Sequence, residues 1–392
     1  MKQILFISIL FLTLSSCQEK QETMQQLIDR SMQVAVQQSK NMAAALNDKP
    51  DMLPKTINPE TGELITSDSG WWCSGFYPGL LWYLYEYTND AELKALAEAY
   101  TDRIEKEQYN LGTHDLGFMI YCPFGNGLRV ADKQEYIDII LTGSKSLCSR
   151  YNPTVGLIKS WDHGTWKYPV IIDNMMNLEM LMWAFKQSGD SMFLEIAESH
   201  ADITMANHFR TDNSCYHVVD YDTITGNVLK KQTAQGAFDE SIWARGQAWG
   251  LYGYTMMYRE TGNDAYLEQA NKIAALMIDH PNMPADMIPY WDYLAPDVPN
   301  EKRDASTASI MASALIELAG YVDGDLKAKY LQVAETQLRT LASPEYLAEV
   351  GTNGGFILKH SVGAIPYNSE IDVPLTYADY YFIEALLRYK NL

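Results

Sequence analysis

Apolar residues recur at helical spacing along nearly the whole chain, with polar residues on the opposite face of each predicted helix. This periodicity predicts an all-α protein built from twelve helices. The helices are expected at 23–48, 75–88, 90–108, 115–128, 133–151, 173–187, 190–208, 243–260, 263–281, 305–321, 325–343 and 377–390.

The connections between these helices alternate between short and long. The short ones combine a helix-stopping residue with a polar residue that favours a helix start. They are Thr88-Asn89-Asp90, Ser188-Gly189-Asp190, Thr261-Gly262-Asn263 and Asp323-Gly324-Asp325. A similar amphipathic helix follows each of them, which indicates a repeated antiparallel helix hairpin.

The long connections are rich in Gly, Pro, Asn, Tyr and Trp, and they span residues 49–74, 152–172, 209–242, 282–304 and 344–376. Alternating apolar residues predict short β segments in two of them, at 214–219 and 355–358. Short hairpins on one side and long loops on the other favour six helix pairs closed into a toroid, with the loops at one mouth. An open solenoid of helix pairs is the alternative.

The first seventeen residues have the character of a bacterial lipoprotein signal peptide. Lys2 precedes an apolar run that is too short to span a bilayer. The run ends in Leu14-Ser15-Ser16-Cys17, which resembles a lipobox, so Cys17 is the expected lipidation site. A signal-peptidase site without lipidation is the alternative. Residues 18–22 are then expected to be a tether, and residues 23–392 a single catalytic domain. We expect the protein to lie in the periplasm or cell envelope of a Gram-negative bacterium, lipid-anchored to the outer membrane.

Charge and cysteine content restrict the possible partners. The chain has 50 acidic and 30 basic residues and a formal net charge of -20, so nucleic acid is not an expected partner. Cys73, Cys122, Cys148 and Cys215 lack the CxxC spacing of a zinc site, and we expect buried thiols. The sequence leaves the oligomeric state open.

Asp173 stands out among the acidic residues because it follows two β-branched residues and precedes a helical pattern. A structural interpretation is available, since an aspartate at a helix start often caps free backbone N–H groups. The apolar flanks instead suggest a partly buried carboxyl group whose pKa is raised toward the range of a general acid. Asp115, in His114-Asp115-Leu116-Gly117-Phe118, has a similar setting upstream.

In the predicted toroid, every second helix begins near an acid, an arginine or an aromatic residue, and these helix starts meet at one mouth. The set comprises Trp71, Trp72, Asp115, Asp173, Arg245, Gln247, Trp249, Arg303, Asp304, Asp372 and Tyr377. Helix N-termini and Arg245 favour an anionic ligand, while Trp72 and Trp249 offer flat faces to sugar rings. This combination indicates a glycosidase for an acidic sugar. His217 and Gln235 are weaker binding candidates, because loop hydrogen bonding is their commoner role.

Together these motifs resemble glycoside hydrolase family 88, the unsaturated glucuronyl hydrolases, over nearly the whole mature chain. The resemblance rests on residues 72–79 (WCSGFYPG), 114–118 (HDLGF), 173–177 (DNMMN), 245–250 (RGQAWG) and 379–386 (DYYFIEAL). It implies an (α/α)6 barrel, in agreement with the twelve predicted helices. It implies neither a metal nor an organic cofactor.

The resemblance also implies a reaction. Its members act on oligosaccharides that polysaccharide lyases produce, which carry a 4,5-unsaturated uronic acid at the non-reducing end. Asp173 matches the acid/base, which protonates C4 and then deprotonates the water that adds to C5, while Asp115 matches an aspartate that binds sugar hydroxyls. The other matched positions bind substrate: Trp72 and Trp249 by stacking, Arg245 as a binding residue, and His217 and Gln235 near the uronate.

Substrate choice and two rival functions stay open at this point. Glycosaminoglycan disaccharides are the leading substrate class, with gellan- or xanthan-type fragments as alternatives. Lys302, Arg303, Lys359, His360 and Ser361 are candidates for meeting a sulfate, although a solvated surface position explains each more simply. The rivals are an unsaturated rhamnogalacturonyl hydrolase of pectin breakdown and a non-catalytic sugar-binding lipoprotein.

Overall fold

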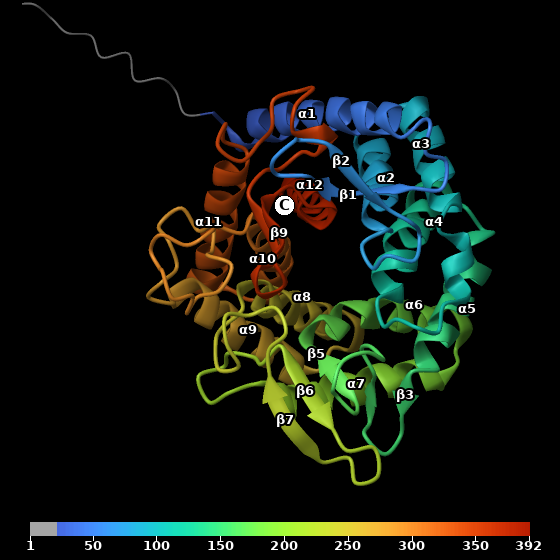
Figure 1. Cartoon of the computed structure of the whole chain (residues 1–392), viewed down its shortest axis with the longest axis vertical. Helices are drawn as coiled ribbons and strands as arrows, with labels where there is room; N and C mark the ends of the chain where they lie inside the picture. The colour runs from blue at the N-terminus through green and yellow to red at the C-terminus, as the bar shows by residue number, and fades with distance from the viewer. Residues whose placement is uncertain (1–21) are drawn as a thin grey trace, which may run out of the picture.

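The computed structural model describes residues 22–392, in which twelve α-helices form a closed ring (Figure 1). The predicted signal peptide, Cys17 and all but the last residue of the tether lie outside the described residues. The helices are α1 Met24–Ala45, α2 Phe76–Thr88, α3 Ala91–Asp102, α4 Asn126–Ala131, α5 Tyr136–Cys148, α6 Leu178–Ser188, α7 Ser191–His208, α8 Ala244–Thr261, α9 Asp264–Asp279, α10 Ala305–Leu318, α11 Gly324–Leu341 and α12 Thr376–Lys390. No helix within 22–392 is long and apolar enough to cross a membrane.

The helices are arranged in two concentric rings, which confirms the predicted (α/α)6 barrel. The even-numbered helices form the inner ring and the odd-numbered helices pack outside them (Figure 1). Within the inner ring α10 contacts both α8 and α12, and α12 contacts α2, so the last helix closes against the first hairpin. This closure excludes the open solenoid.

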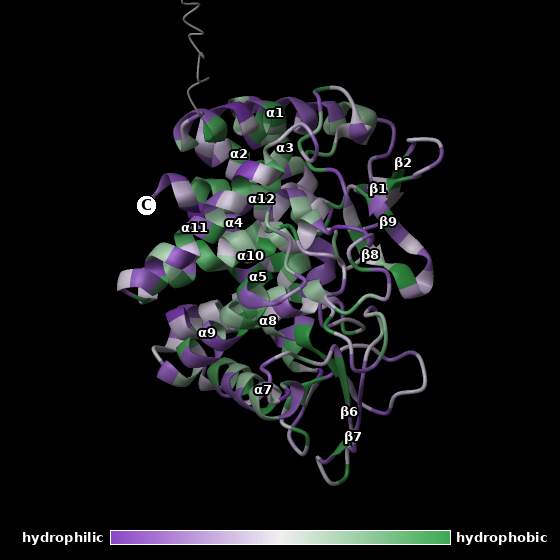
Figure 2. Cartoon of the chain, turned by 90° about the vertical axis from the view of Figure 1, so that its left-hand side faces the viewer, coloured by the Kyte–Doolittle hydropathy of each residue, from purple (hydrophilic) through white to green (hydrophobic). Residues whose placement is uncertain are grey.

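Burial differs between the two rings. In α10, 13 of 14 residues are buried, and many of them are Ala or Ser, which allow close approach of the neighbouring inner helices. In α11 on the outside, only six of 18 residues are buried, and they form one apolar stripe. The barrel interior is therefore a packed core of inner helices, with the outer helices covering it by one face each (Figure 2).

The short turns between hairpins have the predicted chemistry. Asn89, Gly189 and Gly262 end α2, α6 and α8 in the left-handed conformation, with φ of 54°, 73° and 69°. The following residue then caps the next helix, because the side chains of Asp90, Asp190 and Asn263 each accept a backbone N–H two residues on. Each hairpin thus reverses direction within two residues.

Nine short strands occupy the long loops at one end of the barrel (Figure 2). They are β1 Leu53–Ile57, β2 Leu64–Ser67, β3 Tyr151–Asn152, β4 Leu157–Ile158, β5 Pro169–Ile171, β6 Val218–Tyr221, β7 Val228–Gln232, β8 Ser361–Ala364 and β9 Ser369–Val373. The β segment predicted at 214–219 overlaps β6. The one predicted at 355–358 forms only an isolated antiparallel bridge, between Leu358 and Leu347, because Gly355 still belongs to a 3-10 turn with φ of 89°.

Two of the predicted helices do not begin as α-helices. These are the two helix starts that hold the candidate aspartates, and they lie against each other. The helix expected from 115 is a π-helix at Gly117–Gly125 that contains Pro123, which lacks a backbone N–H. The helix expected from 173 begins with a 3-10 turn, Ile172–Asn177. Gly117 lies so close to this turn that a Cβ atom would sit 2.6 Å from the Cα of Asn177, and Phe118 N–H donates to Asn177 Oδ1.

Candidate active site

A cavity of about 750 Å³ opens at the loop end of the barrel. It is lined by five of the seven predicted site residues, namely Trp72, Asp115, Asp173, Gln235 and Arg245. The other two, His217 and Trp249, are buried beside Asp173 and do not line the cavity. The structure therefore brings all seven predicted residues together in one place.

Asp173 is placed by the small β5–β6–β7 sheet. Ile171, the last residue of β5, pairs with Val218 in β6, and Ile172 N–H donates to the carbonyl of His217 at 3.1 Å. The chain then enters the 3-10 turn with Ile171 as its cap, and no side chain caps this turn. The interpretation of Asp173 as an N-cap is therefore wrong.

The carboxyl group of Asp173 is buried, with 8% of the residue exposed. Burial raises the pKa of Asp173 to about 7; the positive charge of Arg245 opposes this rise and the nearby Asp115 adds to it. Its Oδ2 atom has no hydrogen-bond partner among the described residues. Asp173 lines the cavity and can therefore carry a proton near neutral pH beside a bound ligand.

His217 faces Asp173 with a fixed tautomer. The backbone N–H groups of Ala234 and Gln235 both donate to its Nδ1, each at 3.1 Å, so Nδ1 carries no hydrogen. Burial lowers the pKa of His217 to about 3, which keeps the ring neutral. The hydrogen is then on Nε2, which lies 3.8 Å from Asp173 Oδ2. His217 thus offers a donor toward the carboxylate form of Asp173.

Arg245 lines the cavity, but its guanidinium group is already held by the protein. Nη2 donates to the Gly363 carbonyl and to Gln235 Oε1, each at 2.7 Å, and Nη1 donates to the Val362 carbonyl and lies 3.3 Å from Asp304 Oδ2. Asp304 also caps α10. Arg245 is therefore a rigid, partly neutralised cation, and not a free arginine that could close on a ligand.

Asp115 lies at the entry to the π-helix. Thr113 Oγ1 donates to Asp115 Oδ2 at 2.9 Å, and the backbone N–H of Asp115 donates back to Thr113 Oγ1 at 3.1 Å. Burial raises its pKa. These reciprocal bonds fix one carboxyl oxygen and leave Oδ1 directed away from Thr113.

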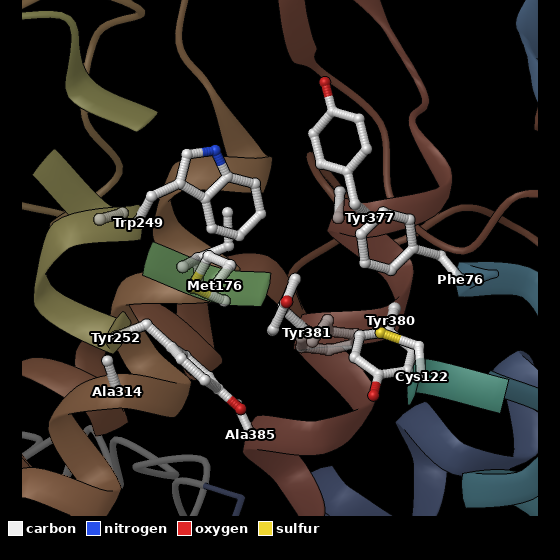
Figure 3. Packing of buried hydrophobic residues seen from close by; sticks show 14 of the residues in the cluster. Phe76, Cys122, Met176, Trp249, Tyr252, Ala314, Tyr377, Tyr380, Tyr381 and Ala385 are labelled. Carbon is white, nitrogen blue, oxygen red and sulfur yellow. The ribbon is translucent and has the colours of Figure 1, made fainter. Parts of the chain in front are cut away.

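The two predicted stacking tryptophans differ. Trp72 is half-buried and lines the cavity, with its ring against Phe118 and Tyr377. Trp249 is fully buried against Phe118 and Tyr381, below the cavity (Figure 3). No part of Trp249 is exposed in this structure, so its stacking on a sugar stays a prediction. The two rings that contact it come from the π-helix at Gly117–Gly125 and from α12.

Several cavity residues were not singled out by their sequence pattern. They are Trp161, His163, Trp166, Tyr367 and Glu370. Trp161 stacks on His163, with ring centroids 5.4 Å apart, and lies edge-on to Trp166. For Trp161, His163 and Trp166 the available signal was the aromatic and glycine content of loop 152–172, which marks a binding loop but selects no residue.

A raised pKa alone does not identify the site. Burial also raises the pKa of Asp379 to about 7, yet Asp379 lies outside this cavity. Both of its carboxyl oxygens accept backbone N–H groups, from Ile357 at 2.9 Å and Leu358 at 2.8 Å. Its role is to hold the loop before β8, whereas Asp173 combines the same pKa with an unoccupied oxygen.

The sulfate candidates Lys302, Arg303, Lys359, His360 and Ser361 do not line the cavity. Lys302 and His360 both pair with Asp372, and Arg303 pairs with Asp286. Lys359 donates to a backbone carbonyl, and Ser361 is buried. Four of the five side chains thus have partners within the protein, and the hydroxyl of Ser361 is buried without one among the described residues.

The cavity, with one protonatable carboxyl group and an aromatic wall at the loop mouth of an (α/α)6 barrel, is the site of a carbohydrate-active hydrolase. An unsaturated glucuronyl hydrolase of Formosa agariphila is 43% identical over 402 residues, covering 100% of this chain and 99% of the relative. The unsaturated glucuronyl hydrolase of Bacillus sp. (strain GL1) is 32% identical and covers 86% and 90%. The chain therefore belongs to the unsaturated glucuronyl hydrolase family, and it is a glycoside hydrolase.

A solved structure supports the same assignment. The crystal structure of an unsaturated glucuronyl hydrolase specific for heparin matches with a TM-score of 0.90 and 48% identity, covering 93% of this chain and 97% of that one. No model of a known protein family matches the chain. The comparisons show an enzyme, and so exclude the non-catalytic lipoprotein. They identify the glucuronyl and not the rhamnogalacturonyl group.

Proposed function

We propose that this enzyme removes the 4,5-unsaturated uronic acid from the products of glycosaminoglycan lyases, by hydrating the C4=C5 double bond. The observation that carries the proposal is Asp173, which lines the cavity and combines burial, a pKa of about 7 and a buried Oδ2 that has no hydrogen-bond partner among the described residues. The heparin specificity of the solved relative favours a glycosaminoglycan among acidic polysaccharides.

One carboxyl group suffices for this reaction. Protonated Asp173 donates its hydrogen to C4, and positive charge develops on C5 and the ring oxygen. The resulting carboxylate then removes a proton from the water molecule that bonds to C5. The hemiketal opens, and the remaining oligosaccharide leaves from C1 with its own oxygen. Ordinary glycosidases instead need two carboxyl groups flanking the glycosidic bond.

The neighbouring groups fit supporting roles. His217 Nε2–H, 3.8 Å from Asp173 Oδ2, is placed to stabilise the carboxylate formed after proton transfer. Asp115 lines the cavity where it can bind sugar hydroxyls, and Trp72 forms an aromatic wall beside it. The fixed charge of Arg245 and the amide of Gln235 favour the uronate carboxylate.

Absorbance of the unsaturated uronate tests the function directly. We expect wild-type protein to remove the ultraviolet absorbance of the conjugated double bond from chondroitin, hyaluronan or heparin lyase products, and to leave pectin lyase products unchanged. Asp173→Asn protein serves as the matched control and should leave every sample unchanged. A stable absorbance with all glycosaminoglycan products would contradict the proposal.

We also propose that the enzyme is exported and lipid-anchored to the outer membrane through Cys17. Support comes from the apolar run, the lipobox-like Leu14-Ser15-Ser16-Cys17 and the polar tether. Cells that express the wild-type chain should incorporate labelled palmitate into a membrane-bound protein, and Cys17→Ser should abolish the label. A soluble, unlabelled wild-type protein would indicate ordinary signal-peptide cleavage.

A further inference from the structure

His114 lines the cavity beside Asp115, and its protonation is fixed from behind. Its Nδ1 lies 2.7 Å from the carbonyl oxygen of Ser160. A carbonyl can only accept a hydrogen bond, so Nδ1 must carry a hydrogen. The residue is buried, and burial lowers its pKa. In the neutral ring, Nε2 therefore has a bare lone pair, which is the opposite tautomer to that of His217.

This bare lone pair lies close to a carboxyl oxygen. His114 Nε2 is 3.1 Å from Asp115 Oδ1, off the direction of an ideal hydrogen bond, and Nε2 has no hydrogen-bond partner among residues 22–392. Thr113 already holds Oδ2, so Asp115 cannot turn away without losing that bond. Two unprotonated acceptors at this distance in a buried site repel each other, and a proton between them removes the repulsion.

We propose that His114 and Asp115 bind one proton between them in the resting enzyme, carried by Asp115 and directed at His114 Nε2. His114 is then a positioning residue, because it keeps Asp115 neutral and fixes the direction of its carboxyl group toward the cavity. Two coupled groups of this kind release their proton as a pair.

The surrounding charges agree with this placement of the proton. Burial raises the pKa of Asp115 and lowers that of His114, and both shifts favour the neutral forms. The charged and titratable groups that face the pair from other elements are Arg150 at the end of α5, Asp173 in the 3-10 turn, His200 in α7 and His217 before β6. His200 and His217 have pKa values of about 3 and add no charge.

The pair affects the reaction through Asp173. A neutral Asp115 adds no net charge next to Asp173, whereas an ionised Asp115 raises the pKa of Asp173. Loss of the acceptor on His114 should let Asp115 ionise at lower pH. Asp173 would then hold its proton to higher pH, and the high-pH limb of the activity profile would move upward.

Nitrogen-15 NMR of histidine-labelled protein locates the proton without any turnover, so its result stands apart from the proposed function. At pH 7 we expect His114, assigned with the His114→Phe variant, to show a protonated Nδ1 and an unprotonated, hydrogen-bonded Nε2. An imidazolium signal, or a proton on Nε2 of a neutral ring, would overturn the proposal.

The pH profile of kcat/KM supplies the second readout, and this one rests on the proposed function. His114→Phe should shift the high-pH limb upward by about one pH unit, and His114→Gln, whose amide oxygen restores an acceptor, should return it toward the wild-type position. His280→Phe, a partly buried histidine remote from the cavity, is the matched control. A limb that stays in place in both His114 variants would overturn the proposal.

Discussion

The barrel has a polar cavity at each end, and the two differ in how their polar atoms are used. The loop-end cavity of about 750 Å³ contains Asp173, with an oxygen that has no partner in the described chain. The cavity at the short-turn end, about 590 Å³, is lined by Glu179, Glu384, Arg259 and Arg388. Their charges are matched pairwise, so polarity alone does not identify a site.

The short-turn cavity is held by a closed network. Glu384 accepts hydrogen bonds from Tyr83 and Tyr252, and its carboxylate lies 3.5 Å from Arg388. Arg388 and Arg259 both pair with Glu317. Such a network stabilises the ends of the inner helices, and it pairs the buried charges of this cavity with one another.

An aromatic layer separates the two cavities. Tyr377 lines the loop-end cavity, and Tyr381, one turn further along α12, lines the short-turn cavity. Phe76, Trp249 and Tyr252 pack around them (Figure 3). The two ends can therefore be changed independently, and each prediction below uses this separation.

The largest effect is expected for Asp173→Asn, which removes the proton donor. The amide cannot protonate C4, so kcat should fall by about 10³- to 10⁴-fold, while the thermal unfolding curve stays in place. Asp379→Asn is the matched control, because this buried aspartate has a similar pKa but only structural partners. It should lower the unfolding free energy by about 1–3 kcal/mol and keep the wild-type kcat. Turnover by Asp173→Asn protein would contradict the assignment.

Arg388→Met should have the opposite effect to Asp173→Asn: it should lower stability and keep kcat. It leaves the buried Glu384 without a charged partner and Glu317 with Arg259 alone, so the free energy of unfolding in urea should fall by about 3 kcal/mol, with little change in kcat. Arg129→Met is the control, since Arg129 pairs with Glu86 at an exposed position and should contribute less than about 1 kcal/mol. A large loss of kcat in folded Arg388→Met protein would show that the two ends are coupled.

The wild-type pH profile should report the pKa of Asp173. Because the acid form donates the proton, kcat/KM should fall about tenfold per pH unit above a midpoint near 7. Steady-state kinetics in buffers of constant ionic strength provide the measurement. A midpoint near 4, with activity only in acid, would mean that burial does not hold the proton on Asp173.

The smallest effect is expected at the rim. Trp71 is exposed and lines the loop-end cavity, so Trp71→Ala should raise KM about fivefold, or ~1 kcal/mol, without changing kcat. Tyr109 is more exposed but lies outside the cavity, and Tyr109→Ala should leave KM unchanged. Equal effects of the two substitutions would count against a binding role for the rim.

The barrel could be predicted from the sequence because its local helix-stop and helix-start signals agree with the overall fold. The left-handed Asn89, Gly189 and Gly262 and the caps that follow them define hairpins without any tertiary information. The π-helix at Gly117–Gly125 was not predictable, since its hydrophobic spacing resembles that of an α-helix. The close approach of Gly117 to Asn177 at its start is a long-range contact that the local sequence does not reveal.

The site was predicted at the level of residues but not of roles. Trp249 is the type of residue that stacks on sugars, and only the structure shows that its ring is fully buried. The sequence does not show that Asp304 and two backbone carbonyls bind the Arg245 guanidinium group, because those partners are 59 to 118 residues away in the chain. Periodicity reports which face of a helix is apolar, but such distant contacts decide what each polar atom can still do.

The protonation of Asp173 is most directly measured by carbon-13 NMR titration of protein labelled at the aspartate carboxyl carbons. The signal that disappears in Asp173→Asn protein identifies the residue, and Asp379→Asn assigns the second buried aspartate. We expect the Asp173 signal to titrate with a midpoint near pH 7. A midpoint near the ordinary value of about 4 would show a carboxylate at neutral pH, and would contradict Asp173 as the group that gives the proton.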